Sequence, residues 1–349
     1  MLRKHTKQIM VGSVPVGGNS PITIQSMTNT NTSNIEETVN QIIKLEDEGL
    51  DIIRCAVNSL DDAKAIVKIK DNISVPLIAD IQFDYKLGLY AVEYGCDCLR
   101  INPGNLKKES EIKEIVNSCK RRKIPIRIGV NSGSIHKDII EKYNGVNVES
   151  LVASAILQTK MLEKYDFTDI KLSIKSSDVL TMIESYKKLS SLVDYPLHLG
   201  VTEAGPFFSS SIKSSIGIGS LLSQGIGDTI RVSITGDPLL EVKVGKEILK
   251  SLKLRKFGVN IVSCPTCART NVDLIKIVND VEEKVKGIKK DITIAIMGCP
   301  VNGPGEAKEA DIGVAFSGED SIFFKKGHFY KRCDKSRLIE QLLEEINLL

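Results

Sequence analysis

The stretch Pro21–Val57, PITIQSMTNTNTSNIEETVNQIIKLEDEGLDIIRCAV, contains the unit from which most of the chain is built. A short apolar run at Ile22–Met27 leads through polar residues into an amphipathic stretch at Asn34–Glu48. A second apolar run follows at Asp51–Val57. Apolar runs of strand length that alternate with amphipathic stretches of helix length are typical of βα units. The stretch therefore predicts a strand, a helix and the next strand.

The same rhythm continues to about Thr235. Six further strand-like runs lie at Pro76–Gln82, Asp97–Asn102, Pro125–Val130, Asp169–Lys175, Pro196–Val201 and Asp228–Ile234. Helix-like stretches separate them, for example Lys107–Arg122 and Asp178–Leu192. Eight consecutive units predict an α/β fold of the (β/α)8 TIM-barrel type. A doubly wound open sheet is the alternative, but eight regular units favour closure.

Beyond the barrel, Leu239–Leu252 reads as the eighth helix, and a smaller α/β unit follows. We predict a barrel domain at residues 1–252 and a second domain at 253–349. The strands expected in the second domain are Gly258–Val262, Asp291–Met297, Ala310–Phe316 and Ser321–Lys325. The helices expected there are Asn271–Lys286 and Lys335–Leu348.

Composition excludes several classes of protein. The 349 residues suit one large domain with a smaller one, and the net charge of +3 gives no general attraction to nucleic acid. No stretch approaches the roughly 20 apolar residues of a membrane span. The chain has eight cysteines and no signal-peptide pattern at its start. We therefore expect a cytoplasmic protein whose thiols are reduced or bound to metal.

Basic residues recur at the predicted strand ends. In a TIM barrel the chemistry sits at the carboxyl ends of the strands. Five cations fall there: Arg54, Arg100, Arg127, Lys175 and Arg231. The other polar residues at these positions are Gln25, Ser26, Asp80, Gln82, Asn102, Asn131, Glu203 and Ser233. Because a fold does not bury so many cations unpaired, and guanidinium groups match phosphate oxygens, we predict a diphosphate or bisphosphate ligand.

Three cysteines of the second domain are spaced like metal ligands. Cys264 and Cys267 form a CxxC pair, and Cys299 follows the apolar run Ile292–Met297 in a loop rich in glycine and proline. Three thiolates and one weaker ligand suit an iron–sulfur cluster with one accessible iron. Spacing alone leaves a structural zinc site, a redox dithiol or three unrelated buried thiols open.

The residues around these cysteines help to distinguish between these kinds of site. SCPTCART at 263–270 and MGCPVNGPGEA at 297–307 resemble the cluster-binding segment of the (E)-4-hydroxy-3-methylbut-2-enyl diphosphate synthase family, iron–sulfur enzymes of non-mevalonate isoprenoid synthesis. The strand ends resemble that family's barrel motifs in the same order: IQSMTNT, DIIRCAV, LIADIQFDY, CLRINPGN, IRIGVNSGS, SIKSSD, LGVTEAG and TIRVSIT. The departures are Gln82, where the family usually has His, together with Ala268 and Pro300.

The resemblance implies a role for each candidate residue. The ligands of a [4Fe-4S] cluster would be Cys264, Cys267, Cys299 and Glu306. The diphosphate would be held by Arg54, Arg100, Arg127 and Lys175, with help from Asn131 and Ser233. Glu203 would be the acid/base residue. We add Asp80, Asn102 and Arg231 to the substrate-binding candidates because they share the barrel mouth.

The reaction implied is the reductive opening of 2-C-methyl-D-erythritol 2,4-cyclodiphosphate to (E)-4-hydroxy-3-methylbut-2-enyl diphosphate, with a flavodoxin or ferredoxin as electron donor. Two other classes of protein remain open. One is a barrel transferase acting on a pterin or another phosphorylated substrate, with a structural zinc. The other is a nucleic-acid-binding module with a zinc ribbon, which the single CxxC pair makes weak.

We also predict a homodimer with active sites shared between chains. The eighth helix runs antiparallel to the strands and carries the chain about 20 Å away from the substrate mouth. The linker from Leu252 to Gly258 is too short to return the second domain to its own mouth. A two-fold pair, in which each second domain caps the partner's barrel, solves this, and the family's arrangement implies the same.

Overall fold

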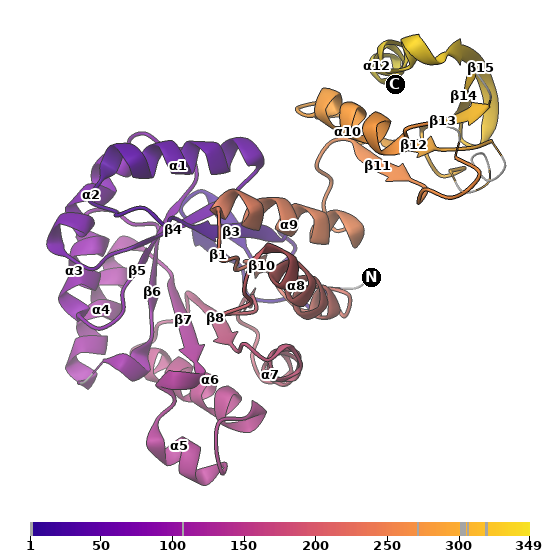
Figure 1. Cartoon of the computed structure of the whole chain (residues 1–349). Helices are drawn as coiled ribbons and strands as arrows, with labels where there is room; N and C mark the ends of the chain where they lie inside the picture. The colour runs from indigo at the N-terminus through magenta and orange to yellow at the C-terminus, as the bar shows by residue number, and fades with distance from the viewer. Residues whose placement is uncertain (1–2, 107, 271, 301–304, 306, 318–319) are drawn as a thin grey trace. The chain divides into compact units, whose positions relative to one another are not determined.

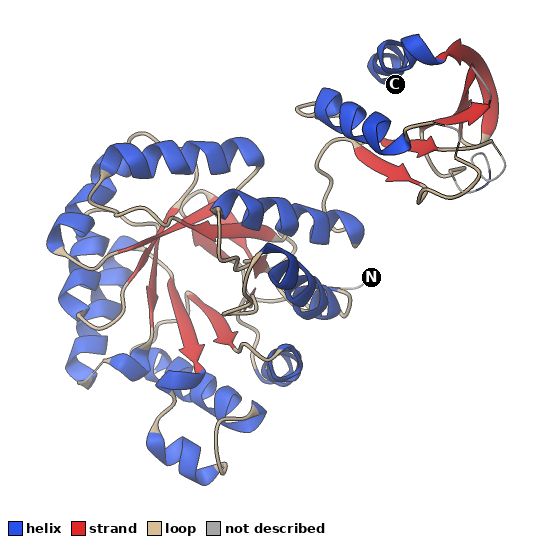
Figure 2. Cartoon of the chain, viewed as in Figure 1, coloured by secondary structure: helices blue, strands red, loops and turns tan. Residues whose placement is uncertain are grey.

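The computed structural model describes the chain except for residues 1–2, 107, 271, 301–304, 306 and 318–319. The chain divides into two compact units, Met1–Arg255 and Lys256–Leu349 (Figure 1). The first unit carries a parallel barrel, and the second carries a mixed sheet with helices (Figure 2).

The described part of the first unit has eight barrel strands, in the order β8-β7-β6-β5-β4-β3-β10-β9. Their bounds are β3 Thr23–Met27, β4 Ile52–Ala56, β5 Leu77–Asp80, β6 Cys98–Ile101, β7 Ile126–Asn131, β8 Ile170–Lys175, β9 His198–Leu199 and β10 Thr229–Ile230. Neighbouring strands are parallel, and a parallel bridge between Leu172 and Leu197 joins β8 to the segment that leads into β9. The predicted barrel is confirmed.

Helices surround this sheet (Figure 2). They are α1 Ile35–Glu48, α2 Leu60–Lys70, α3 Tyr85–Glu93, α4 Glu109–Arg122, α5 Lys137–Lys142, α6 Val148–Glu163, α7 Val179–Leu192, α8 Phe207–Leu222 and α9 Pro238–Ser251, with short 3-10 helices at Pro103–Asn105 and Ser132–Ser134. Local sequence sets their ends. The Asn34 side chain accepts the Glu37 N–H at the start of α1, and Gly49 ends that helix at φ 102°, which suits glycine.

A short hairpin, β1 Ile9–Val11 and β2 Val14–Val16, closes the bottom of the barrel. Its apolar residues share a core with Ile52, Ile78 and Cys98, which stand at or near the amino ends of β4, β5 and β6. The sequence did not predict this hairpin, because strands of three residues are too short for a periodic pattern. The open mouth is therefore the opposite end, where the strands finish.

The second unit has a five-stranded sheet in its described part, in the order β11-β12-β13-β14-β15. The strands are β11 Asn260–Ser263, β12 Thr293–Met297, β13 Ile312–Ser317, β14 Asp320–Lys325 and β15 His328–Asp334; the helices are α10 Leu274–Val285, a 3-10 turn Lys335–Arg337 and α12 Leu338–Leu348. Strands β11, β12 and β13 are parallel to one another, β14 is antiparallel to β13, and β15 is antiparallel to β14. The sequence did not predict β15, whose residues HFYKRCD are largely exposed and mix aromatic with charged side chains.

Candidate functional site

A row of ionisable residues crosses four neighbouring strands of the barrel. The strand registers pair Asp80 with Arg100, Arg100 with Arg127, and Arg127 with Lys171. Paired residues of adjacent strands share one face of a sheet. Leu99 packs toward Gly88 in the helical layer, so Arg100 and the rest of the row face the barrel interior. All four side chains are buried.

Asp80 is the acid on which this row converges. Its carboxylate accepts Arg100 Nη1 at 2.9 Å and Gln82 Nε2 at 3.1 Å, and Arg54 Nε lies 3.6 Å away. Burial alone would raise the pKa of Asp80, but Arg54, Arg100 and Arg127 together lower it, so the group is a carboxylate. Gln82, at the position where the resemblance led us to expect histidine, thus donates its amide N–H to Asp80.

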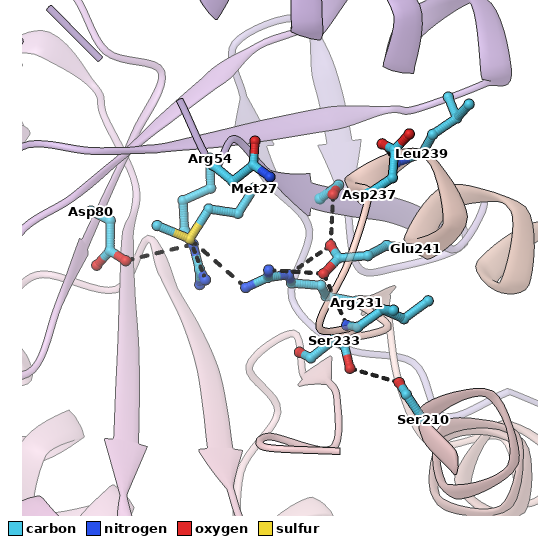
Figure 3. Close-up of polar contacts among 12 residues, drawn as sticks. Met27, Arg54, Asp80, Ser210, Arg231, Ser233, Asp237, Leu239 and Glu241 are labelled. Atoms are coloured by element: carbon cyan, nitrogen blue, oxygen red, sulfur yellow. Dashed lines mark hydrogen bonds and ion pairs between the residues drawn. The ribbon is translucent and has the colours of Figure 1, made fainter. Parts of the chain in front are cut away.

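A second cluster joins β3, β4 and the end of β10 (Figure 3). Arg54 Nε and Nη2 contact the Met27 sulfur at 3.0 and 2.9 Å. Arg231 binds Glu241 through Nε and Nη2, both at 3.1 Å. Glu241 also accepts Ser26 Oγ at 2.7 Å. Met27 and Glu241 were not among the site residues predicted from the sequence. In the sequence, Glu241 is recognisable as an acidic residue one turn into the helix that follows the eighth strand.

Several of the buried guanidinium nitrogen atoms at the mouth lack a hydrogen-bond partner within the described part of the chain. Among the described residues, Arg127 has no hydrogen bond at Nε, Nη1 or Nη2, and the same holds for Arg54 Nη1 and Arg100 Nε. Burial lowers the pKa of Arg127 to about 10 and lowers that of Arg54 well below its usual value. Burial, followed by repulsion from the mouth arginines, lowers the pKa of Lys175. Such a cluster is stable when an anion fills it.

The other predicted site residues lie on β7 and on the segments that follow β6, β9 and β10. Asn102 is buried, and its side chain accepts Gly104 N–H at 3.1 Å in the loop after β6. Asn131 ends β7 in register with Lys175. The Ser233 carbonyl accepts Ser210 Oγ at 2.6 Å. Glu203 is exposed in the loop after β9 and adopts a left-handed φ of 52°.

The predicted metal ligands lie on two neighbouring loops of the second unit. Cys264 follows β11 and Cys299 follows β12, and these strands are parallel partners in which Ser263 pairs with Ile296. Cys264 Sγ accepts Gly298 N–H at 3.2 Å, which ties the loops together. Cys267 is exposed, and all three thiols are free. Glu306 lies outside the described residues.

These three thiols fit an iron–sulfur group by donor chemistry and by the adjacency of their loops. Within the described residues, no three potential ligands already converge on one point. The remaining free cysteines are Cys55, Cys96, Cys98 and Cys119, which are buried, and Cys333, which is half-buried. His198 is a packed residue of the barrel: its side chain is buried and contacts Thr229 Oγ1 at 3.3 Å.

Comparison with known proteins gives consistent matches. Residues 6–246 match the family described as GcpE TIM-barrel domain, and residues 260–348 match GcpE protein C-terminal domain. A 4-hydroxy-3-methylbut-2-en-1-yl diphosphate synthase (flavodoxin) of Caldanaerobacter subterraneus is 54% identical over 99% of this chain and 97% of that protein. The protein of the same name from Clostridium tetani is 56% identical over 99% of each chain.

Among solved structures, dihydropteroate synthase from Stenotrophomonas maltophilia is similar with a TM-score of 0.53 and 14% identity, over 71% of this chain and 98% of that one. At this identity the likeness shows a shared barrel fold alone. Within the described residues, no helix has the length and apolar character needed to cross a bilayer.

Proposed function

The chain belongs to the GcpE family, and from this premise we propose that it catalyses the reductive ring opening and dehydroxylation of 2-C-methyl-D-erythritol 2,4-cyclodiphosphate. The product is (E)-4-hydroxy-3-methylbut-2-enyl diphosphate, an intermediate of isoprenoid biosynthesis. The enzyme is an oxidoreductase: two electrons enter, and one oxygen leaves as water. The observation that carries this proposal is the set of buried, unpartnered guanidinium nitrogens at the barrel mouth.

The diphosphate binds at this mouth. Arg54, Arg100, Arg127 and Lys175 neutralise it. Asp80 pairs with Arg54 and Arg100 and so offsets one of these four positive charges, and guanidinium and ammonium groups bind phosphate oxygens strongly. Five further residues line the substrate: Asp80, Asn102, Asn131, Arg231 and Ser233. Asp80 orients Arg54 and Arg100 through its carboxylate, and Glu241 does the same for Arg231.

Glu203 supplies the proton that lets the oxygen leave as water. Its backbone is held in a left-handed conformation at the carboxyl end of the barrel, where non-glycine residues are rare unless the surroundings require it. Its exposed side chain is free to approach a substrate seated on the arginines.

The cofactor is a [4Fe-4S] cluster held by Cys264, Cys267, Cys299 and Glu306. Such a cluster supplies electrons one at a time and offers an iron as a Lewis acid. The three thiolates that would hold it lie on the loops after β11 and β12. A carboxylate as fourth ligand exchanges more readily than a thiolate. We assign the substrate site to residues 1–252 and the cluster site to residues 253–349.

The electron donor is a flavodoxin, as the names of the relatives say of those proteins, or a ferredoxin. We place the reaction in the cytoplasm, in a homodimer with active sites shared between chains. The zinc-dependent transferase is the second candidate, and the barrel similarity alone does not favour it.

Metal content and turnover test the proposal together. Protein purified without oxygen should be brown and contain about four irons and four sulfides per chain. It should convert the cyclic diphosphate when a reduced flavodoxin is present. A colourless zinc protein, or a brown one that leaves the cyclic diphosphate unchanged, would contradict the proposal. Cys333→Ala serves as the control, because that cysteine is outside the cluster motif and should keep both colour and turnover.

A further inference from the structure

Lys171 is a buried lysine that the site described above does not use. It lies on β8, four residues before Lys175, so both side chains point to the barrel interior. At about 3.3 Å per residue, the backbone of Lys171 lies roughly 13 Å farther from the carboxyl end of β8 than the backbone of Lys175 does. The register partner of Lys171 on β7 is Arg127. Lys171 is thus the last cation of the row that begins at Asp80, at the level of Arg127.

The surroundings of Lys171 leave its charge poorly compensated. Its side chain is 0% exposed, and Nζ has no hydrogen-bond partner within the described chain. The charged and titratable groups that face it are Arg54 from β4, Cys98 from β6, Arg127 from β7, His198 from β9 and Asp228 before β10.

Two of these neighbours are neutral. Burial raises the pKa of Cys98, which is a thiol, and burial together with Arg127 and Lys171 lowers the pKa of His198. Asp228 is the acid of the group, and its carboxylate is already occupied by Arg3, by Thr6 Oγ1 at 3.0 Å and by Leu197 N–H at 2.8 Å. Lys171 and Arg127 therefore stand side by side as buried cations, and neither forms a direct ion pair within the described part of the chain.

We propose that Lys171 is a positioning residue of the diphosphate site: its charge beside Arg127 keeps the guanidinium directed at the mouth and is fully compensated when the diphosphate binds. The inference rests on the proposed function, because it takes the cyclic diphosphate as the anion. It assigns Lys171 no contact with the substrate. A buried cation strengthens anion binding at several ångströms because the interior screens charge weakly.

Removal of the charge then has two effects of opposite sign. Methionine has nearly the length of the lysine side chain, and replacement of an uncompensated buried charge by an apolar group stabilises a protein. Lys171→Met should therefore raise the melting temperature of the protein without substrate. The same change should weaken substrate binding roughly tenfold, the effect of one charge acting through a medium of intermediate dielectric.

The pH dependence provides a further readout. Burial lowers the pKa of Lys171 to about 8 in the protein without ligand. The amine is charged below that pH and loses its proton as the pH rises through it. The binding advantage of the native protein over Lys171→Met should therefore be full at pH 6.5 and decline above pH 8. A residue that only fills space would give a difference independent of pH.

The experiment uses the oxidised, cluster-loaded protein without reductant, so that substrate binds and does not react. Thermal unfolding without substrate and titration with 2-C-methyl-D-erythritol 2,4-cyclodiphosphate between pH 6.5 and 9 are measured for the native protein, for Lys171→Met and for Lys160→Met. Lys160 is exposed on α6 and serves as the matched control, in which neither quantity should change. Lys171→Arg keeps the charge and should retain most of the affinity.

The outcomes distinguish a failure of the inference about Lys171 from a failure of the proposed function. A Lys171→Met protein that melts earlier, or does not fold, contradicts the inference, which requires a gain in stability. Unchanged affinity in that variant also overturns it and leaves the proposed function intact. A native protein that fails to bind the cyclic diphosphate contradicts the proposed function and this inference together.

Discussion

Glu203 combines an unusual backbone with a chemically useful side chain. Its φ of 52° lies in the left-handed region, which costs a residue with a Cβ about 1 kcal/mol or more. Glycine would adopt this conformation without that cost. Retention of a glutamate at such a position is explained when its carboxylic acid acts in the reaction.

Substitution separates the two properties. Glu203→Gln should bind the cyclic diphosphate normally but lower kcat by about two orders of magnitude or more, because proton donation is lost. Glu203→Gly should lose turnover as well and gain about 1 kcal/mol of stability. Steady-state kinetics and denaturant unfolding measure these effects.

Asp166 supplies the control for this pair of variants. It has the same φ of 52°, in the exposed turn after α6. Asp166→Gly should gain similar stability and keep full turnover. Near-normal kcat in Glu203→Gln would remove Glu203 from the mechanism.

At the scale of elements, strand β7 makes room for an arginine of its neighbour. A Cβ added at Gly129 would lie 2.9 Å from Arg100 Nε and 3.0 Å from Nη2. Arg100 in turn binds Asp80 at 2.9 Å. The glycine of β7 thus allows the Asp80–Arg100 pair to occupy the barrel interior.

Gly129→Ala should displace the Arg100 guanidinium and raise KM for the cyclic diphosphate severalfold. The cost in stability should be about 1–3 kcal/mol, as for other overpacked interiors. Gly133→Ala is the matched control, since a Cβ there meets no atom within 4 Å. An unchanged KM in Gly129→Ala would mean that the geometry of Arg100 is not critical for binding.

The sheet of the second unit has a comparable close approach. Gly313 on β13 pairs with Phe324 on β14, and a Cβ at Gly313 would lie 2.1 Å from the Phe324 ring. Gly313→Ala should therefore destabilise the second unit by about 1–3 kcal/mol. The double variant Gly313→Ala with Phe324→Leu should recover part of this loss. Additive losses in a double-mutant unfolding cycle would refute the predicted contact.

At the scale of the whole molecule, substrate and cluster residues belong to different units of the chain. Helix α9, which ends at Ser251, runs back along the barrel toward the end opposite the mouth, and β11 begins at Asn260. This connection is the reason for proposing that each active site combines the barrel of one chain with the cluster unit of another.

A mixing experiment tests the shared site. Chains carrying Arg127→Ala, inactive in the barrel, are combined with chains carrying Cys299→Ala, inactive in the cluster. Mixed dimers should regain one intact site of two and hence up to about half of the native activity per dimer. Mixing Arg127→Ala with Arg54→Ala is the control and should recover none. Mixed dimers that form without activity would leave a site built within one chain.

The sequence alone determined the features that depend on neighbouring residues. The repeated apolar and amphipathic runs predicted the barrel, because strand and helix periodicities extend over only a few residues. Position at a strand end predicted Arg100, Lys175 and Arg231 at the mouth, since all parallel strands of a barrel finish on one face. Arg54 and Arg127 stand two and four residues before the ends of their strands. The cysteine motifs were recognised from residues that are close in sequence.

Only the tertiary structure decided which distant residues meet. Glu241 binds Ser26 across 215 residues, and no local pattern contains that contact. The short hairpin β1–β2 closes the barrel by packing on three strands that follow it much later in the chain. The row from Asp80 to Lys171 depends on strand register, in which a shift of one residue would turn every side chain to the other face. Register follows from the packing of the whole barrel, and for this reason Lys171 became visible as a site residue only in the folded molecule.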